Sequence, residues 1–282
     1  SPYYDDFDKY KNFYRVLFKP GHPVQARELT ALQSSLQNQV ESFGSHIFKE
    51  GSMVIPGNIN VDVNYSAVKL NSDHLGVDIS IYGSYLVGKR LRGQDSEVVA
   101  IVTRYENINE STGITDPTVF VKYIRSGTAN EVVPFTDGET LIIESSFTYG
   151  NTTISAEDTV ATLISENATS VGSAASVGKG VFFIRGTFVD VETNNIVLDP
   201  YTNTPSYRIG LTISEEIISA KDDASLYDNA KGFSNYAAPG ADRLKISTTL
   251  SKKLLTDHDD KTFVELVRVE NGVIKKLQDK TQ

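Results

Sequence analysis

Residues 181–218, VFFIRGTFVDVETNNIVLDPYTNTPSYRIGLTISEEII, decide the fold class. Short runs of β-branched and aromatic residues are separated there by turn sequences such as ETNN, a pattern typical of short strands. The same pattern continues in RLKISTTLSKKLL, TFVELVRVENG and VIKKL, where Asn271-Gly272 is a tight hairpin signal. The last third of the chain is therefore predicted to be β.

Residues 84–150 lie between this region and an earlier β region, and they contain short strand candidates separated by turn-rich segments such as NINESTGITDP. Strands of this length and spacing are typical of a small closed barrel. The next stretch is dominated by Ser, Thr, Gly, Ala and Asn, which predicts a connector. We therefore expect a mainly β protein with one long N-terminal α-helix, in which a small β-barrel is inserted into a β domain. The expected parts are an aromatic docking arm at 1–22, a helical oligomerisation segment at 23–50, a discontinuous β domain at 51–83 and 179–282, the inserted barrel at 84–150 and the connector at 151–178.

A strong helical pattern precedes the strands. Apolar residues recur there at intervals of 3, 4, 4, 3 and 4 residues, which is the period of a straight α-helix and not that of a supercoil seam. Pro23 suits a first helical turn and Gly44 weakens the other end, so we predict a helix over residues 24–43. The apolar stripe consists of Leu29, Leu32, Leu36, Val40, Phe43 and Ile47.

The remaining surface of this helix is rich in neutral polar residues. Between Ala26 and Ile47 the only charged residues are Arg27, Glu28 and Glu41, whereas Gln, Ser and Asn are frequent. An ordinary solvated face carries more charge, so this surface favours a helix flanked by protein, including symmetry copies of itself. A simple one-sided amphipathic helix is the alternative. The expected oligomer interface consists of Leu29, Leu32, Leu36, Gln39, Val40, Phe43 and Ile47.

The first 18 residues are rich in Tyr and Phe. So many large rings form an exposed apolar patch unless another surface covers them. They pack either onto this chain's own core or onto a neighbouring subunit, where Tyr combines a large contact area with a polar group. The following KPGHP favours extended backbone, and we expect it to lead the arm away from the helix rather than back onto it. The expected docking residues are Tyr3, Tyr4, Phe7, Phe13 and Tyr14.

The chain lacks the residue patterns of common catalytic sites. It contains no cysteine, which excludes disulfides, thiolate nucleophiles and cysteine zinc sites. The four histidines (His22, His46, His74 and His258) are far apart, and no nucleophile-elbow, zinc-protease or dinucleotide motif is present. A net charge of −9 argues against nucleic-acid binding, and no apolar run reaches the roughly 18 residues of a membrane span. We expect no enzyme activity, no cofactor, no nucleic-acid partner and no membrane insertion.

Two further segments are candidates for a binding role. TDHDDKT at 256–262 groups Asp257, Asp259 and Asp260 and could hold a hard cation, but it lacks the glycine and distal glutamate of a calcium loop. We predict a solvated turn there and no metal site. Residues 221–241, KDDASLYDNAKGFSNYAAPGA, show no periodicity and predict a long loop, and loops of this length usually carry contacts or a function.

Four stretches of the chain carry a family resemblance. They are SPYYDDFDKYKNFYRVLFKPGHPVQARELTALQSSLQNQVESFGSHIFKEGSMVIPG at 1–57, GVFFIRGTFVDV at 180–191, YTNTPSYRIGLTISEEII at 201–218 and GFSNYAAPGADRLKI at 232–246. Together they resemble a domain family of uncharacterised function that occurs in virion structural proteins of tailed bacteriophages, notably contractile-tailed phages and cyanophages. The resemblance spans most of the chain, with 84–178 the least distinctive part, and it brings no catalytic residues with it.

The resemblance implies a virion protein of the tail, baseplate or tail fibre. We therefore expect a non-enzymatic N-terminal part of a tail-fibre or baseplate component, which forms a homotrimer and anchors distal fibre modules to the tail. Its expected partners are copies of itself and other tail or baseplate proteins, and the chain is expected to be part of a longer polypeptide. Two alternatives are a receptor- or glycan-binding module that uses residues 221–241, and the N-terminal part of a depolymerising tailspike. If neither alternative applies, we expect host surface glycans to be bound by distal parts of the fibre and not by this chain.

Overall fold

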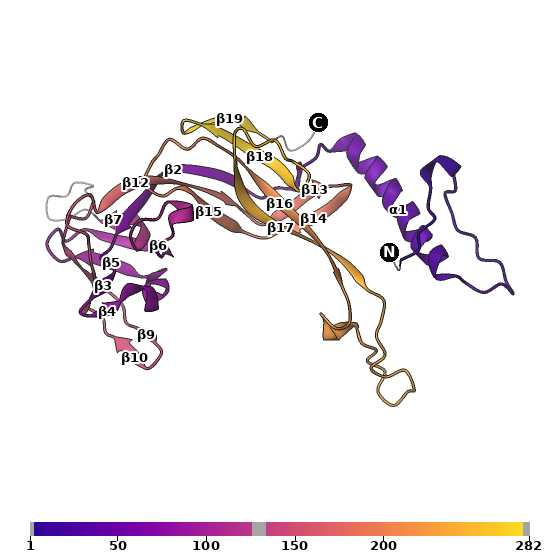
Figure 1. Ribbon diagram of the computed structural model, residues 1–282, viewed down its shortest axis with the longest axis horizontal. Helices are drawn as coiled ribbons and strands as arrows, with labels where there is room; N and C mark the ends of the chain where they lie inside the picture. Colours follow the sequence, from indigo (N-terminus) through magenta and orange to yellow (C-terminus); the bar gives the residue numbers. More distant parts are fainter. Residues whose placement is uncertain (1–2, 126–133, 279–282) are drawn as a thin grey trace.

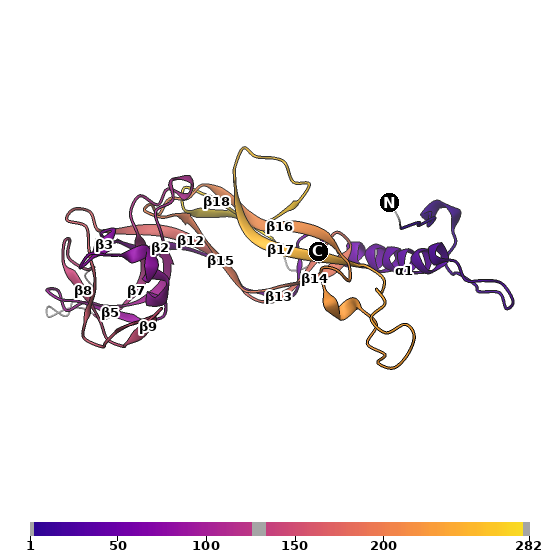
Figure 2. The same ribbon diagram turned by 60° about the horizontal axis from the view of Figure 1, so that its bottom comes forward.

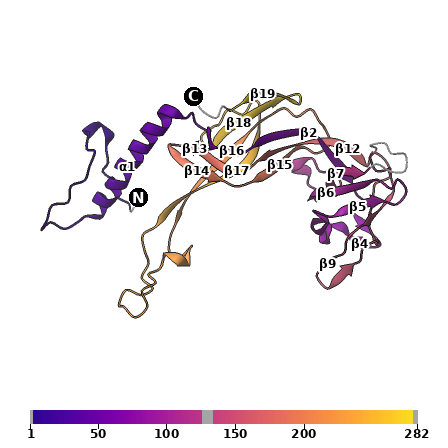
Figure 3. The same cartoon turned by 180° about the vertical axis from the view of Figure 1, so that it is seen from behind.

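A computed structural model describes residues 3–125 and 134–278. The molecule is elongated (Figure 1), with a barrel at one end, a β-sheet body in the middle and helix α1 (Ala26–Ile47) projecting from the other end. A long ribbon of β16 (Tyr207–Ile218) and β17 (Arg243–Leu254) leaves the body at the same end as α1, as Figure 3 shows from behind. The prediction of a mainly β fold with one long N-terminal helix is confirmed.

Three antiparallel sheets carry most of the strands. The first contains, in spatial order, β1 (Met53–Ile55), β13 (Gly180–Ile184) and β14 (Thr187–Val191). The second contains β11 (Thr159–Thr162), β8 (Thr140–Ile143), β5 (Arg90–Gly93), β6 (Val99–Glu106), β7 (Thr118–Arg125), β2 (Ile59–Lys69), β12 (Thr169–Val177) and β15 (Asn194–Asp199). The third contains β17, β16, β18 (Phe263–Glu270) and β19 (Val273–Leu277).

Short elements complete the described chain. Two hairpins are formed by β3 (Asp73–His74) with β4 (Val77–Asp78), and by β9 (Phe147–Tyr149) with β10 (Thr152–Ile154). The single-turn 3-10 helices are η1 (Lys9–Lys11), η2 (Ile79–Ile81), η3 (Gly83–Leu86), η4 (Glu110–Thr112) and η5 (Ala224–Leu226).

Part of the eight-stranded sheet closes into a barrel. The strands from β11 through β8, β5, β6 and β7 to β2 are neighbours in the sheet, and an antiparallel bridge between Leu70 and Leu163 joins its two ends. The amide of Asn71 also donates to the carbonyl of Thr162 at 2.8 Å, and the ring of strands is visible in Figure 2. The predicted barrel bounds of 84–150 are therefore too narrow, because β2 and β11 lie outside them.

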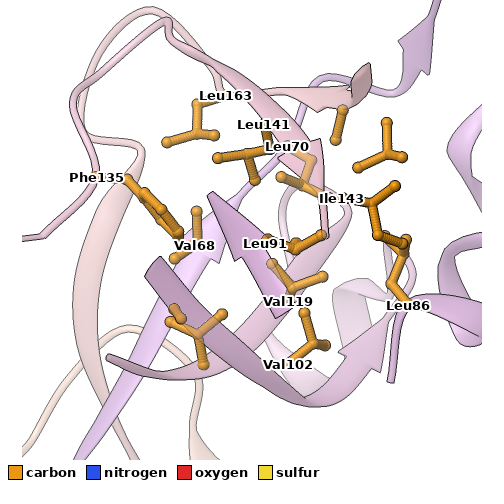
Figure 4. Packing of buried hydrophobic residues seen from close by; sticks show 14 of the residues in the cluster. Val68, Leu70, Leu86, Leu91, Val102, Val119, Phe135, Leu141, Ile143 and Leu163 are labelled. Carbon is orange, nitrogen blue, oxygen red and sulfur yellow. The ribbon is translucent and has the colours of Figure 1, made fainter. Parts of the chain in front are cut away.

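Apolar side chains from these strands fill the barrel (Figure 4). Antiparallel strands alternate inward and outward side chains, so each strand contributes only a few residues to the interior. The inward set includes Val68 from β2, Leu91 from β5, Val102 from β6, Val119 from β7 and Ile143 from β8, together with Leu70, Leu86, Phe135, Leu141 and Leu163.

Buried tyrosines predict how this protein responds to alkali. Burial is the largest cause that raises the pKa of Tyr82, Tyr105, Tyr123 and Tyr207 to about 12, against 10.0 for an ordinary tyrosine. Because the unfolded chain releases these protons more readily, their contribution to stability is present below pH 10 and is lost as the pH rises towards 12. Phenolate absorbance should therefore show two groups of tyrosines, with the second appearing together with unfolding. A single step near pH 10 for all 14 tyrosines would contradict this packing.

The body has a second core, separate from that of the barrel. The four-stranded sheet contributes Ile209, Leu211 and Val267 to it, and β13 contributes Phe182 and Ile184. Strands β2 and β12 are long enough to serve both cores, because their paired ends reach from the body into the barrel wall. The two parts are therefore joined by continuous strands rather than by a linker.

The predicted connector at 151–178 is wrong. It contains β10, β11 and β12, and β12 is paired on both sides, with β2 and with β15. Small residues are needed there because the backbone packs closely: a Cβ at Gly172 would lie 2.8 Å from the carbonyl oxygen of Asp199. A Gly, Ala and Ser composition that is typical of flexible connectors is here a strand between two neighbours.

Helix α1 begins and ends later than the predicted 24–43. At its start, the amide of Gln25 donates to the side chain of Glu28 at 2.8 Å, half of a capping box. At its end, the helix continues through Gly44 to Ile47. Gly44 is buried against the ring of Phe183, which a Cβ at this position would overlap. Gly44, which predicts a weak helix end, is therefore the residue at which the helix packs closely against the body.

Candidate functional site

The apolar stripe of α1 is open to solvent. Its side chains lie three or four residues apart and therefore line one face of the helix. Leu32 is half-buried and Gln39 is exposed. The exposed fractions of the others are 50% for Leu29, 61% for Leu36, 42% for Val40, 66% for Phe43 and 37% for Ile47. The structure thus places all seven predicted interface residues on a helix whose apolar face its own chain leaves largely uncovered.

A second face of α1 contacts the body. The side-chain amide of Gln37 donates to the carbonyl of Gly186 at 2.9 Å and to the hydroxyl of Thr187 at 3.1 Å. Near the C-terminal end, the ring of Phe48 lies 5.9 Å from that of Phe183. These contacts involve the β13–β14 hairpin and fix the angle at which α1 projects. They do not involve the apolar stripe.

A third face of α1 contacts the N-terminal arm, contrary to our expectation for KPGHP. The backbone reverses at Gly21, which has a φ of +80°, and the amide of His22 donates to the carbonyl of Lys19 at 3.2 Å. The hydroxyl of Ser35 then donates to the carbonyl of Tyr14 at 3.2 Å. Two prolines favour extended backbone, but the glycine between them supplies the positive φ that a tight reversal needs.

Charged and polar groups hold the arm along the helix. Arg27 lies 3.6 Å from the carboxylate of Asp6, and the hydroxyl of Ser34 donates to Asp5. Between arm and helix remains a cavity of about 340 Å³. Its lining includes Phe7, Phe13, Val16, Leu17 and Ala31.

The rings of the arm are not packed into the core of their own chain. Tyr4 is 77% exposed and Phe13 is 71% exposed, and Tyr3 and Tyr14 are also exposed, whereas Phe7 is half-buried. The hydroxyl of Tyr3 donates to Asp242, and this hydrogen bond is the main cause that raises the pKa of Tyr3. The five predicted docking residues therefore lie at the same end of the molecule as the stripe. That they contact a neighbouring molecule remains a prediction.

The loop at 221–241 caps the β16–β17 ribbon. It contains η5 and is organised around Asp228, whose amide donates to the carbonyl of Ala238 at 2.9 Å and whose carboxylate accepts the amide of Ala230 at 2.7 Å. Phe233 and Tyr236 are exposed on it. The loop is thus an ordered tip whose most exposed rings are those of Phe233 and Tyr236.

The acidic turn of residues 256–262 is anchored to the body by a buried arginine. Nη2 of Arg208 lies 2.8 Å from both carboxylate oxygens of Asp260, and Nζ of Lys253 lies 3.7 Å from Asp257. The carboxylate of Asp257 also accepts the amide of Asp259 at 3.1 Å. Sequence spacing groups the three aspartates, but it does not reveal their arginine, which comes from a distant strand.

The remaining candidate groups do not converge. His74 is held between the hydroxyls of Thr159 and Thr162, and burial lowers its pKa. The other three histidines are exposed. Within residues 3–125 and 134–278 we find no cluster of His, Asp or Glu arranged for a metal ion. In the same residues, none of the helices combines the length and apolar character that crossing a membrane requires.

Comparison with known proteins identifies a family. A family model described as "Domain of unknown function (DUF4815)" matches residues 1–81 and 142–282. The interval between them contains β5, β6 and β7 of the barrel. No curated protein and no solved structure matches the chain. Because the family match covers well over half of its residues, the chain belongs to the DUF4815 family, a domain of unknown function.

Proposed function

We propose that this protein is a non-enzymatic structural component of a tailed-bacteriophage virion, in which α1 and the arm join copies of the chain into a homotrimer. In this proposal the chain is the N-terminal part of a tail-fibre or baseplate component and anchors distal modules to the tail. The observation that carries the assembly role is the solvent-exposed stripe of α1. The virion context rests on the resemblance of residues 1–57 and of the later β segments.

The stripe and the arm together offer enough apolar surface for a stable interface. Full burial of a Leu, Val, Ile or Phe side chain contributes about 1.5–3 kcal/mol. Five stripe side chains are 37–66% exposed, so covering them contributes on the order of 5 kcal/mol per copy. Each exposed aromatic ring adds up to ~150–250 Å². The total apolar area that the stripe and the arm expose is therefore of the order of the ~800 Å² that each partner buries in a stable interface.

A second copy of this chain is the occupant that the charges favour. Arg27 is paired with Asp6 of its own chain, and Glu41 lies beside Gly186 of the body, so neither charge belongs to the stripe. Symmetry brings the same residues of each copy together, which is tolerated only where like charges do not meet. An uncharged apolar stripe meets that condition. We choose a trimer because threefold symmetry is usual for fibres in the class that the sequence resembles.

The oligomeric state tests this proposal. We expect light scattering during gel filtration to give about three times the 31.0 kDa mass of one chain. We also expect the assembly to be a single discrete species that dissociates on dilution. A mass of one chain at the highest concentration reached, with the helical circular-dichroism signal intact, would contradict the assembly role.

Deletion of residues 1–18 separates the role of the arm from folding. Hydrogen bonds and an ion pair join the arm to α1 and to Asp242, so the barrel and body should keep their thermal unfolding midpoint without it. In phage particles produced with the deleted protein, we expect this component to be missing. Incorporation at the level of the intact chain would show that the rings of the arm do not dock onto a neighbour.

Receptor binding is the second candidate function, and the exposed rings of Phe233 and Tyr236 favour it. They lie on the ribbon tip, away from both cores, where a partner can reach them. A glycan array probed with the chain and with the double variant Phe233→Ala/Tyr236→Ala tests this candidate. Binding that disappears in the double variant would favour a recognition role for the 221–241 loop.

A further inference from the structure

Two cavities lie where the barrel meets the body. Their volumes are about 220 Å³ and about 540 Å³, and both are lined by Thr112 and Lys252, so they form one cleft. The barrel side of the cleft comes from β6 and from the loop that follows it, and the body side comes from β15, β17 and the residues after β15. Its size is in the range of small-molecule sites.

The floor of the cleft is apolar. Ile114 of the barrel and Ile196 and Val197 of β15 line the smaller cavity, and Tyr201 and Pro200 line the larger one. The floor is also held in place. The hydroxyl of Tyr201 lies 2.9 Å from that of Thr118, and Nζ of Lys69 lies 4.2 Å from the centre of the Tyr201 ring. This is a preformed surface for the C–H face of a small ring.

Three polar side chains around this floor can form further hydrogen bonds, namely those of Asp199, Glu106 and Lys252. Tyr207 donates to Oδ1 of Asp199 at 2.7 Å, and Arg104 donates to Oε1 of Glu106 at 2.5 Å. Within the described residues, the second oxygen of each of these carboxylates accepts no hydrogen bond. Nζ of Lys252 donates to the carbonyl of Leu198 and lies 4.8 Å from the centre of the Tyr207 ring, and it makes no other hydrogen bond within the described residues. Partial burial lowers the pKa of Lys252.

We propose that this cleft binds a neutral saccharide. A sugar ring presents one apolar C–H face and a rim of hydroxyls that both donate and accept. The carboxylates of Glu106 and Asp199 would accept from hydroxyls, and the ammonium of Lys252 between the two cavities would donate to a hydroxyl oxygen. An anionic ligand fits less well, because Arg104 and Lys253 of the lining are already paired with Glu106 and Asp257, whereas the second oxygens of Glu106 and Asp199 would face it. The proposal does not depend on self-assembly, since the cleft includes neither α1 nor the arm.

The cleft is also distinct from the loop at 221–241, and the family match covers only its body side. Its barrel wall, from Arg104 to Ile114, lies in the interval that the family model does not match, whereas β15 and β17 lie within the match. A ligand in the cleft would therefore contact some residues that the family model does not match.

Saturation-transfer NMR on the intact chain tests the proposal, with galactose, glucose, mannose and N-acetylglucosamine as neutral probes and glucuronate as the acidic probe. We expect transfer to at least one neutral probe and weaker transfer to glucuronate. Lys252→Met keeps the length of the side chain and should weaken binding about tenfold, the effect of one lost charged hydrogen bond. Lys275→Met, at an exposed position on β19, is the matched control and should bind as the unchanged chain does.

Two further variants keep the result interpretable. Asp199→Asn preserves the shape of the side chain and its acceptor for Tyr207, so weaker binding in a folded Asp199→Asn variant supports the site even if Lys252→Met fails to fold. Phe233→Ala/Tyr236→Ala should leave binding unchanged. Transfer to none of the neutral probes, preference for glucuronate, or equal binding by the folded Lys252 and Lys275 variants would overturn the proposal. The mass of the assembly should not change in any of these variants, so failure here would leave the assembly role intact.

Discussion

Leu36→Asp should convert the assembled protein into single chains without unfolding them. Leu36 is 61% exposed on one chain, so a carboxylate there remains hydrated in the monomer. In the assembly the same carboxylate would be buried beside its symmetry copies without a counter-charge. Burying an unpaired charge costs about 3–5 kcal/mol, which is comparable to what the stripe contributes. Sedimentation velocity should therefore show a loss of the assembled species at micromolar concentration.

The matched control for this variant is Ser45→Asp. Ser45 is exposed and lies nine residues after Leu36, which places it on the opposite side of the helix. It introduces the same charge into the same element but away from the stripe. Assembly should persist in the Ser45 variant. Equal assembly by the two variants would show that the stripe is not the interface.

Arg208→Met should destabilise the body by about 3–5 kcal/mol. The arginine side chain is only 5% exposed and bonds to the carboxylates of Glu265 and Asp260 and to the carbonyl of Asp257. Removing it leaves the buried carboxylate of Glu265 with fewer donors and releases the acidic turn. The midpoint of urea unfolding measures the loss.

A surface ion pair provides the comparison. Lys179 and Glu192 lie 2.8 Å apart with side chains 70% and 73% exposed, and such exposed pairs contribute little to stability. Lys179→Met should therefore change the unfolding midpoint little. Similar losses for the two variants would mean that the Arg208 network does not stabilise the body.

The same network determines how stability depends on acid. Burial raises the pKa of Glu265, but hydrogen bonds from Arg268 and Arg208 outweigh it and lower the pKa below its ordinary value of 4.5. A carboxylate with a depressed pKa in the folded state stabilises the protein above the pKa of the unfolded chain and loses that effect as the pH falls through its folded pKa. Urea midpoints of the unchanged chain should fall below pH 4.5, and the fall should be smaller in the Arg208 variant.

The elements that local sequence patterns specify are the ones that could be predicted. The spacing of the stripe from Leu29 to Ile47 identifies the helix, because its period is a local property. The end of the helix is predicted wrongly because the contact of Gly44 with Phe183 joins residues far apart in sequence. A small closed barrel is predicted, but its bounds of 84–150 are too narrow for the same reason, because the bridge that closes it joins Leu70 and Leu163 from outside that range.

Predictions from composition are wrong where close backbone packing or a turn requires a particular residue type. β12 reads as a connector because it is rich in Gly, Ala and Ser, yet it lies between two paired strands. The arm is predicted to leave the helix because KPGHP contains two prolines, yet Gly21 allows it to turn back. In both cases one glycine has a specific backbone role that composition does not reveal. The cleft at the barrel–body junction is beyond sequence patterns altogether, since Arg104, Asp199 and Lys252 come together only through the fold.

Cross-linking through a single cysteine tests most directly whether the stripe of α1 joins copies of the chain. The natural sequence contains no cysteine, so Val40→Cys places one thiol on the stripe, and Lys275→Cys places one on an exposed position of β19 as the control. With a short bis-maleimide reagent at the concentration where the chain assembles, we expect covalent dimers from the Val40 variant and almost none from the Lys275 variant. Equal cross-linking by the two variants, or a Val40 variant that stays monomeric on a denaturing gel, would contradict assembly through α1.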